Sequence, residues 1–395
     1  MSEWKEYKLG EVVSIASGFA YKGEYIGKGD GLLLGMGCVS YKEKFLMSGA
    51  RPYLGDCAER YYANAGDIVL ATRQQSDNLP ILGMPAIIPN ELKDKKLIVG
   101  ANLYRVTNNS DFDNKYIYWL LKTPAYVKHI ASCKTGTTVG MITKADIENF
   151  VFIAPDKSKR KQILETIGSL DDKIDLLHRE NATLEQMAET LFRQWFVVEA
   201  KEEWEEGSVV DLAKHCKDSI NPQKHPNTVF EHYSIPAFDD GKKPTAETGE
   251  NIQSNKYLVP TNCILFSKLN PHKDKRVWLM LDDVPDNAIC STEFQIVKPS
   301  YPEYLYFLYG WLTNKENYDE IASGVGGTSG SHQRIDPKSI FSFSCPNVDI
   351  ETIRNYNNKV EPLFYKIRNN QKQIQTLIQT RDGLLPRLMS GEVKL

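Results

Sequence analysis

The chain has 395 residues, of which 41% are hydrophobic and 25% are charged, and its formal net charge is −3. Its apolar runs fall short of the roughly 18 residues that a membrane-spanning helix needs, and its first residues lack the sections of an export signal. We therefore expect a soluble, cytoplasmic protein with two domains of ordinary size.

The acidic residues are concentrated in one segment. Residues 163–206 contain twelve acidic and four basic side chains, so the rest of the chain carries a surplus of five positive charges. This surplus is compatible with phosphate contact, although it is far smaller than that of a purely electrostatic nucleic-acid binder.

A first domain is predicted over residues 1–155. Runs of β-branched and aromatic residues, such as GDIVLAT at Gly66 and KLIVGANLYRV at Lys96, alternate with Gly, Pro and Asn clusters and predict short strands. An apolar stripe from about Tyr116 to Ile130 predicts a helix. We expect its aromatic side chains to pack in the core, and a platform for stacked bases is the alternative.

A long helix is predicted over residues 156–198, with Asp156 as its N-cap. Its apolar residues recur at alternating steps of four and three, which is the pattern of a coiled-coil seam, and Asn181 takes the one polar position. The apolar positions are Ile163, Ile167, Leu170, Ile174, Leu177, Leu184, Ala188, Leu191 and Trp195.

The second half of the chain repeats the first in the same order, which predicts a second domain over residues 199–346. EWKEYKLGEVV at Glu3 is matched by EWEEGSVVDLA at Glu203, and GDIVLATR at Gly66 is matched by TNCILFSK at Thr261. Order is kept while spacing drifts, as loop insertions produce in a duplicated unit. Further matches pair LYRV with FQIV, Tyr116 with Tyr304, Gly136 with Gly327 and Pro155 with Pro346.

A second long helix is predicted over residues 347–395. Its seam runs from Ile353 to Leu388, with Asn370 and Arg381 at polar positions. Pro362 is expected to kink or restart the helix because proline lacks a backbone N–H. This helix is net positive and the first is net negative, which favours their pairing. Packing of each helix on its own domain or on another chain is the alternative.

The linker KEEWEEG is too short to return the chain along a helix of about 60 Å, so the two helices are expected to run antiparallel. The predicted fold class is α+β: two duplicated, strand-rich domains of mixed structure joined by two long helices in an antiparallel coiled coil, with a pseudo-two-fold axis. Such a molecule suits a DNA duplex with two separated half-sites. Because the loops of the two domains differ, the half-sites are expected to differ in sequence.

Five motifs follow one another along the chain in a characteristic order: GDIVLATR, GTTVGMI, PDKSKRKQI, LFRQWF and RDGLLPRLMSGE. This order resembles the specificity subunits of type I restriction-modification systems over essentially the whole chain, and LFRQWF and LLPRLMSGE are its most specific parts. In one respect the chain departs from the family. The acid–glutamine pair usual where the long helices begin is Lys161-Gln162 here and Glu351-Thr352 in the second repeat.

The resemblance implies two target recognition domains that together read a bipartite, asymmetric DNA site, with one half-site per domain. It also implies two methyltransferase subunits docked on the long helices and an ATP-driven restriction subunit. S-adenosylmethionine and ATP would belong to those partners, so we expect no cofactor on this chain. A tandem-domain scaffold that binds polypeptides is the alternative, and the positive surplus outside residues 163–206 argues against it.

Two polar loops in each domain are the candidate DNA contacts, because Arg, Lys, Asn and Gln can meet base edges from loops braced by strands. A solvated charge run and a plain flexible turn are the alternatives. The candidates of the first domain are Arg73, Gln74, Gln75, Asn78, Lys134, Thr137 and Thr138. Those of the second domain are Lys268, Asn270, His272, Lys273, Arg276, Ser329, His332, Gln333 and Arg334.

No catalytic constellation is found in the sequence. It contains no G-x-S-x-G, H-E-x-x-H or Walker A motif and no amino-methyltransferase motif. The histidines show no spacing typical of a metal site, and the seven cysteines include no C-x-x-C pair and are expected to be reduced. We therefore predict a non-catalytic, DNA-binding subunit.

Overall fold

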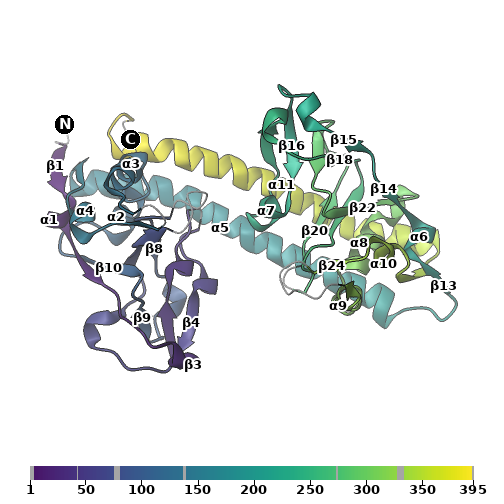
Figure 1. Cartoon of the computed structure of the whole chain (residues 1–395), viewed down its shortest axis with the longest axis horizontal. Coiled ribbons are helices and arrows are strands. Elements are labelled where there is room, and N and C mark those ends of the chain that lie inside the picture. Colours follow the sequence, from purple (N-terminus) through teal and green to yellow (C-terminus); the bar gives the residue numbers. More distant parts are fainter. Residues whose placement is uncertain are drawn as a thin grey trace. The chain divides into compact units, whose positions relative to one another are not determined.

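The computed structural model describes residues 4–41, 43–74, 81–136, 139–272, 275–326 and 333–393 (Figure 1). The chain forms two compact units: unit 1 comprises Met1–Leu176 and Gln373–Leu395, and unit 2 comprises Leu177–Lys372. Each unit contains a strand-rich part and a segment of both long helices, α5 (Lys157–Arg193) and α11 (Ile350–Met389). No helix in the described ranges is both long enough and apolar enough to cross a membrane.

Unit 1 is built on a four-stranded antiparallel sheet in the order β2-β10-β6-β8. Along β6, Ile68 and Leu70 pack with the helices on one face, while Val69 and Ala71 pack with a second sheet on the other. Strand β6 is therefore buried on both faces. The strands are β2 (Val13–Ser17), β10 (Leu103–Asn108), β6 (Ile68–Ala71) and β8 (Pro85–Ile87).

The second sheet of unit 1 has the order β4-β3-β9-β5 and contains one parallel pair, β3 with β9. Two short strands, β1 with β12, form a separate antiparallel ladder. The bounds are β4 (Ala50–Tyr53), β3 (Ile26–Leu34), β9 (Leu97–Val99), β5 (Tyr62–Ala63), β1 (Lys5–Lys8) and β12 (Val151–Ala154).

Unit 2 repeats this plan. Its four-stranded sheet has the order β14-β22-β19-β20, which matches the first sheet of unit 1 strand for strand, and its second sheet again contains one parallel pair, β16 with β21. The predicted internal repeat is thus present. The strands of the first sheet are β14 (Ala213–Cys216), β22 (Phe294–Pro299), β19 (Cys263–Ser267) and β20 (Val277–Met280). Those of the second are β15 (Ser219–Ile220), β18 (Lys256–Leu258), β21 (Ala288–Cys290), β16 (Val229–Tyr233) and β17 (Thr245–Thr248). Strands β13 (Glu205–Ser208) and β25 (Ser344–Asn347) correspond to β1 and β12.

The helix expected over Tyr116 to Ile130 is two helices, α2 (Asn114–Leu120) and α3 (Pro124–Cys133). The chain is interrupted at Thr123, whose hydroxyl accepts a hydrogen bond from the backbone N–H of Tyr126, and Pro124 occupies the first position of α3. Unit 2 also has two successive helices here, α8 (Leu305–Thr313) and α9 (Lys315–Ser323), although α9 begins without a side-chain cap or a proline. The shorter helices are α1 (Leu9–Val12), α4 (Lys144–Glu148), α6 (Val209–Leu212), α7 (Ile235–Asp239) and α10 (Pro337–Phe341).

The ladders correct the residue-by-residue alignment of the two repeats. Val106 pairs with Ile68 in unit 1, and Val297 pairs with Ile264 in unit 2, so Ile68 corresponds to Ile264 and not to Cys263. The offset of 191 residues between β10 and β22 holds as far as α3 and α9, so Tyr116 corresponds to Phe307 and not to Tyr304. Likewise, Ala154 pairs with Lys5 in unit 1 and Asn347 pairs with Glu205 in unit 2, so Ala154 corresponds to Asn347. The expected match of Pro155 with Pro346 is therefore wrong by two residues.

The long helices begin with equivalent caps. The Asp156 carboxylate accepts a hydrogen bond from the backbone N–H of Lys159 at 3.0 Å, as predicted for an N-cap, and Asp349 accepts one from Thr352 at 2.8 Å. Helix α11 continues through Pro362 without a break, so the expected restart there is wrong. A proline inside a helix removes one backbone hydrogen bond, and the packing of α11 maintains the helix around that gap.

Polar partners lie in the seam between the helices of each unit. In unit 1, Nη1 of Arg381 lies 2.8 Å from Oδ1 of Asp171, and the guanidinium covers the ring of Trp119 at 5.2 Å. In unit 2, Asn370 contacts Asn181. Within unit 2, Asn181 contacts Asn370 and Phe192 contacts Tyr356, so partner numbers fall along α11 as they rise along α5. The helices therefore pair antiparallel there, as predicted.

Candidate nucleic-acid interface

The two candidate loops of unit 1 meet in a short ladder. Strand β7 (Arg73–Gln74) leaves β6 and pairs antiparallel with β11 (Gly140–Met141), so that Arg73 lies opposite Met141. A bridge between Thr135 and Met141 joins the chain segment that follows α3 to the same ladder. The structure therefore places residues 73–74 and residues 134–141 beside one another at one edge of unit 1.

Arg73 and Lys134 present positive charge at this edge. Both side chains are exposed. The stem of Lys134 lies across Gly140, where a Cβ atom would come within 2.6 Å of Lys134 Cε. Glycine at this position therefore allows the lysine to cross the ladder. The arrangement provides one planar guanidinium and one ammonium on a backbone that is fixed by strand pairing.

Gln74 has a different environment from the one expected of a DNA contact. Its side chain is buried, and its Oε1 accepts a hydrogen bond from the backbone N–H of Leu82 at 3.3 Å. The amide braces the segment that precedes β8, so the expectation that Gln74 touches DNA is corrected. The candidates Gln75, Asn78, Thr137 and Thr138 lie outside the described residues.

Unit 2 has the same kind of platform after the equivalent strand, β19. Leu269 forms a bridge with Arg334, and the backbone N–H of Asn270 donates to the carbonyl of Gln333 at 2.8 Å. The backbone N–H of Ile335 donates to the carbonyl of Lys268 at 3.0 Å. Strand β24 (Arg334–Ile335) also pairs with β23 (Val325–Gly326), so the two candidate loops of unit 2 are brought together as well.

The candidates of unit 2 differ in accessibility. Lys268, Asn270 and Gln333 are half-buried, and His272 and Arg334 are exposed. Asn270 has a φ of 47°, a left-handed conformation that asparagine tolerates better than most residues. Lys273, Ser329 and His332 lie outside the described residues.

Arg276 is a structural residue rather than a DNA contact. Its side chain is buried, and its Nε and Nη2 atoms donate to the Asp239 carboxylate at 2.6 and 2.9 Å. This bidentate pair ties the segment before β20 to the end of α7. This partner could not be predicted from the sequence, because Asp239 lies 37 residues away. The expectation that Arg276 contacts DNA is corrected.

Known specificity subunits of restriction enzymes are similar to this chain. Residues 1–186 match the model of the type I restriction modification DNA specificity domain. The type I restriction enzyme MjaIX specificity subunit of Methanocaldococcus jannaschii is 25% identical over 330 residues, which is 73% of each chain. The chain is thus similar to type I restriction-modification specificity subunits, through a specificity domain over residues 1–186 and over most of its length in the second comparison.

Two further comparisons give similar results. The HindI specificity subunit of Haemophilus influenzae is 30% identical over 209 residues, covering 50% of this chain and 41% of that one. The crystal structure of a type I restriction-modification S subunit from M. genitalium superposes with a TM-score of 0.58 at 15% identity, over 98% of this chain and 96% of that one. This second likeness concerns the fold.

Within this fold, sequence reasoning missed the charged surroundings of His215. Burial, together with the nearby charges of Lys217 and Lys268, lowers the pKa of His215 to about 4. Its imidazole stacks on the ring of Phe341 with centroids 5.1 Å apart, and it is neutral at pH 7. His215 therefore adds no positive charge beside Lys217 and Lys268. The segment AKHC of β14 carries no motif that would have predicted this.

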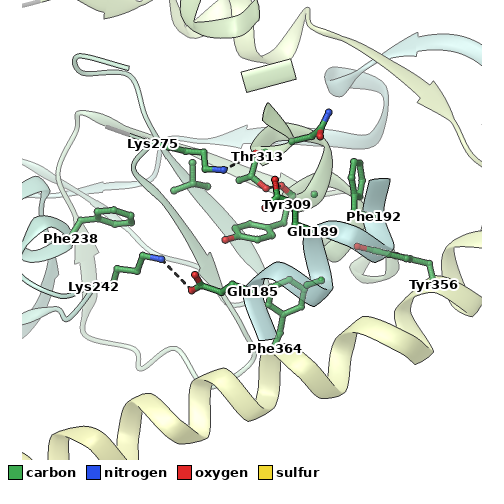
Figure 2. Close-up of a pocket in the computed structure, with 14 residues that line it drawn as sticks. Glu185, Glu189, Phe192, Phe238, Lys242, Lys275, Tyr309, Thr313, Tyr356 and Phe364 are labelled. Carbon is green, nitrogen blue, oxygen red and sulfur yellow. Dashed lines mark hydrogen bonds and ion pairs between the residues drawn. The ribbon is translucent and has the colours of Figure 1, made fainter. Parts of the chain in front are cut away.

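A cleft in unit 2 is separate from the candidate DNA contacts. It has a volume of about 130 Å³ and is lined by residues of α5, α8 and α11 and by Lys242 and Lys275 (Figure 2). Lys242 points to Glu185 and lies 3.3 Å from its Oε1, and Lys275 Nζ donates to the Thr313 carbonyl at 2.9 Å. Glu189 adds a second carboxylate to the lining. The two lysines and two carboxylates balance in charge, so the cleft offers no positive surplus for a phosphate.

Proposed function

We propose that this chain is the DNA-recognition subunit of a type I restriction-modification system and reads a bipartite, asymmetric site, with one half-site per globular part. One observation carries the proposal. In both units, a two-strand platform extends from a buried strand of the main sheet, β6 or β19, and displays basic side chains. Side chains held on such a paired backbone have the limited freedom that base readout requires.

The two platforms carry different side chains at equivalent positions, which supports an asymmetric site. The ladders align Arg73 with Leu269 and Met141 with Arg334. The arginine therefore lies on the first strand of the platform in unit 1 and on the second strand in unit 2. A guanidinium on a different strand of the platform meets the base edges at a different position. The two units would therefore recognise different base sequences.

We further propose that methyltransferase subunits dock on the long helices and that a restriction subunit joins the same complex. Support comes from apolar side chains that α5 exposes away from its seam, Leu176 in unit 1 and Met187 in unit 2, at 49% and 47% exposure. Exposed apolar side chains of this kind favour contact with other proteins. S-adenosylmethionine and ATP would be bound by these partners, and the chain itself would be non-catalytic.

The proposed function is tested by measuring DNA binding of the full chain, alone and with co-expressed methyltransferase subunits. Fluorescence anisotropy with random-core duplexes is expected to show binding that weakens as salt rises, because phosphate contacts release counterions. Sequencing of the bound duplexes is expected to give two short base sequences, one per half-site, at a fixed separation. A protein-binding scaffold would instead show no salt-sensitive binding in either preparation.

A further inference from the structure

Arg334 and Glu293 form a bidentate pair at the edge of unit 2 that carries the candidate DNA contacts. Nε of Arg334 donates to Oε2 of Glu293 at 3.1 Å, and Nη2 donates to Oε1 at 2.9 Å. The side chains are 48% and 24% exposed, so the pair lies at the surface with the arginine more accessible than the glutamate. Glu293 immediately precedes β22 and was not among the residues predicted from the sequence.

The backbone beneath this pair is held by strand-like hydrogen bonds. Lys268 lies between the two residues: its N–H donates to the Glu293 carbonyl at 3.0 Å, and its carbonyl accepts from the N–H of Ile335, the neighbour of Arg334, at 3.0 Å. The side chains of Arg334 and Glu293 therefore meet over the Lys268 segment. Their backbones are about two strand spacings apart, on the order of 10 Å. Both ends of the pair are fixed before any ligand arrives.

The geometry of the pair leaves a specific set of donors for a ligand. A guanidinium has five N–H groups. Glu293 occupies the Nε–H group and one N–H of Nη2. As far as the described residues show, the end of the fork formed by Nη1 and the other N–H of Nη2 remains for a ligand. That end presents two parallel donors, which match the O6 and N7 acceptors of guanine in the major groove.

We propose that Arg334 reads a guanine in the half-site of unit 2 and that Glu293 is the positioning residue that orients it. This inference rests on the proposed function, because it requires unit 2 to bind DNA.

The charge of the pair favours a base over a phosphate. Glu293 carries a negative charge beside the guanidinium, so the pair as a whole is neutral and gains little from a phosphate, which the carboxylate repels. A guanine edge is uncharged and needs only the two directed donors. Lys268 is better suited than Arg334 to contact a phosphate at this edge, because the two hydrogen bonds of the Glu293 carboxylate go to Arg334.

The test selects bound sequences from a randomised duplex library with the full chain and its methyltransferase partners. The variants are R334K, R334A and E293Q. R334K keeps the charge and loses the planar fork, so it is expected to lose about 5- to 150-fold preference for guanine at one base pair, with binding to other sequences unchanged. E293Q is expected to weaken the same preference and to bind unselected duplex more tightly, because a negative charge is removed.

The matched control is R354K. Arg354 and Glu303 form an ion pair at 3.3 Å on the surface of the same unit, outside the platform, so this variant should retain every base preference. Each variant is compared with the wild type by thermal unfolding, so that a folding defect is seen independently of binding.

The outcomes separate this inference from the proposed function. If the wild type selects no sequence, the proposed function fails. If the wild type selects two words and R334K retains both in full, Arg334 does not read a base. A uniform loss of affinity in R334A without a change of preference would identify a phosphate contact and would also overturn the inference.

Discussion

Asn370 donates a hydrogen bond from Nδ2 to Oδ1 of Asn181 at 2.9 Å, in the seam between α11 and α5 of unit 2. It also donates to Oε2 of Glu180 at 2.9 Å. Both asparagines are at least nine-tenths buried in an otherwise apolar seam. Each amide therefore removes the cost of burying the other, and a shift of either helix along the seam would break the pair.

Replacing Asn370 by Ala leaves the Asn181 carbonyl buried without this donor. The expected cost is about 1–3 kcal/mol of unfolding free energy, measured by urea denaturation. The double variant N181L/N370L should recover most of that loss, because it removes both polar groups together. The exposed Asn358 on the same helix is the matched control, and N358A should change stability by less than about 0.5 kcal/mol. Equal effects of N370A and N358A would contradict the prediction.

Arg73 is expected to contribute to only one of the two DNA words. R73A should relax the half-site read by unit 1 by about 1–3 kcal/mol per lost bidentate contact and leave the other word intact, as measured by sequencing selected duplexes. Arg51 of β4, which is exposed in the same unit, serves as the control in R51A. Loss of both words together in R73A would indicate a folding defect instead.

Two helical glycines are predicted to respond to alanine in opposite ways. At Gly310 in α8, a Cβ atom would lie 2.2 Å from Cδ2 of the buried Phe192, so G310A should lower stability by about 1–3 kcal/mol. At Gly168 in α5, a Cβ atom would meet nothing within 4 Å, so G168A should raise stability by about 0.5–1 kcal/mol through reduced backbone entropy. Thermal unfolding of both variants measures the difference. A stabilised G310A would show that the ring of Phe192 moves freely.

Asp283 is predicted to make stability depend on pH in the acidic range. Burial opposes its ionisation, but hydrogen bonds from Lys372 at 2.6 Å and Arg368 at 3.0 Å outweigh that effect, so the pKa of its carboxyl lies below the ordinary value of 3.8. A lowered folded-state pKa stabilises the protein above that ordinary value, and the stabilisation is lost as pH falls through the folded-state pKa.

The difference in stability between the wild type and D283N should therefore be constant from about pH 7 to pH 5 and should shrink below about pH 4. Urea unfolding at a series of pH values measures it. D218N, at an exposed aspartate of the same unit, is the control. A difference between wild type and D283N that persists unchanged at pH 3 would show that the two basic partners do not lower the pKa.

The repeat, the caps and the seam could be predicted because each leaves a periodic or local pattern. The alignment within the repeat could not. Strand β6 is buried on both faces, so its sequence does not alternate between apolar and polar residues. Without that alternation, the sequence does not show whether Ile264 or Cys263 is the residue of unit 2 that corresponds to Ile68. The error at Tyr116 was three residues, nearly one helical turn, which returns an apolar side chain to the same face.

For the candidate site, the sequence indicated the loops but not the environment of each side chain. The polar residues of the candidate loops suggested Arg73 and Arg334, which are exposed. The burial of Gln74 and Arg276 depends on partners from other segments, the N–H of Leu82 and the carboxylate of Asp239, and such tertiary contacts have no local signature. Glu293 was missed for the same reason, because it lies 41 residues from Arg334.

The core of unit 1 is completed by Leu385, Leu388 and Met389, which follow the whole of unit 2 in the chain. During translation, unit 2 leaves the ribosome with all its residues, whereas unit 1 must wait with an open apolar surface until the last helix emerges. Stalled synthesis would consequently release a chain with an uncovered first unit, which proteases and chaperones recognise. Folding of unit 1 is thereby coupled to synthesis of the segment that follows unit 2.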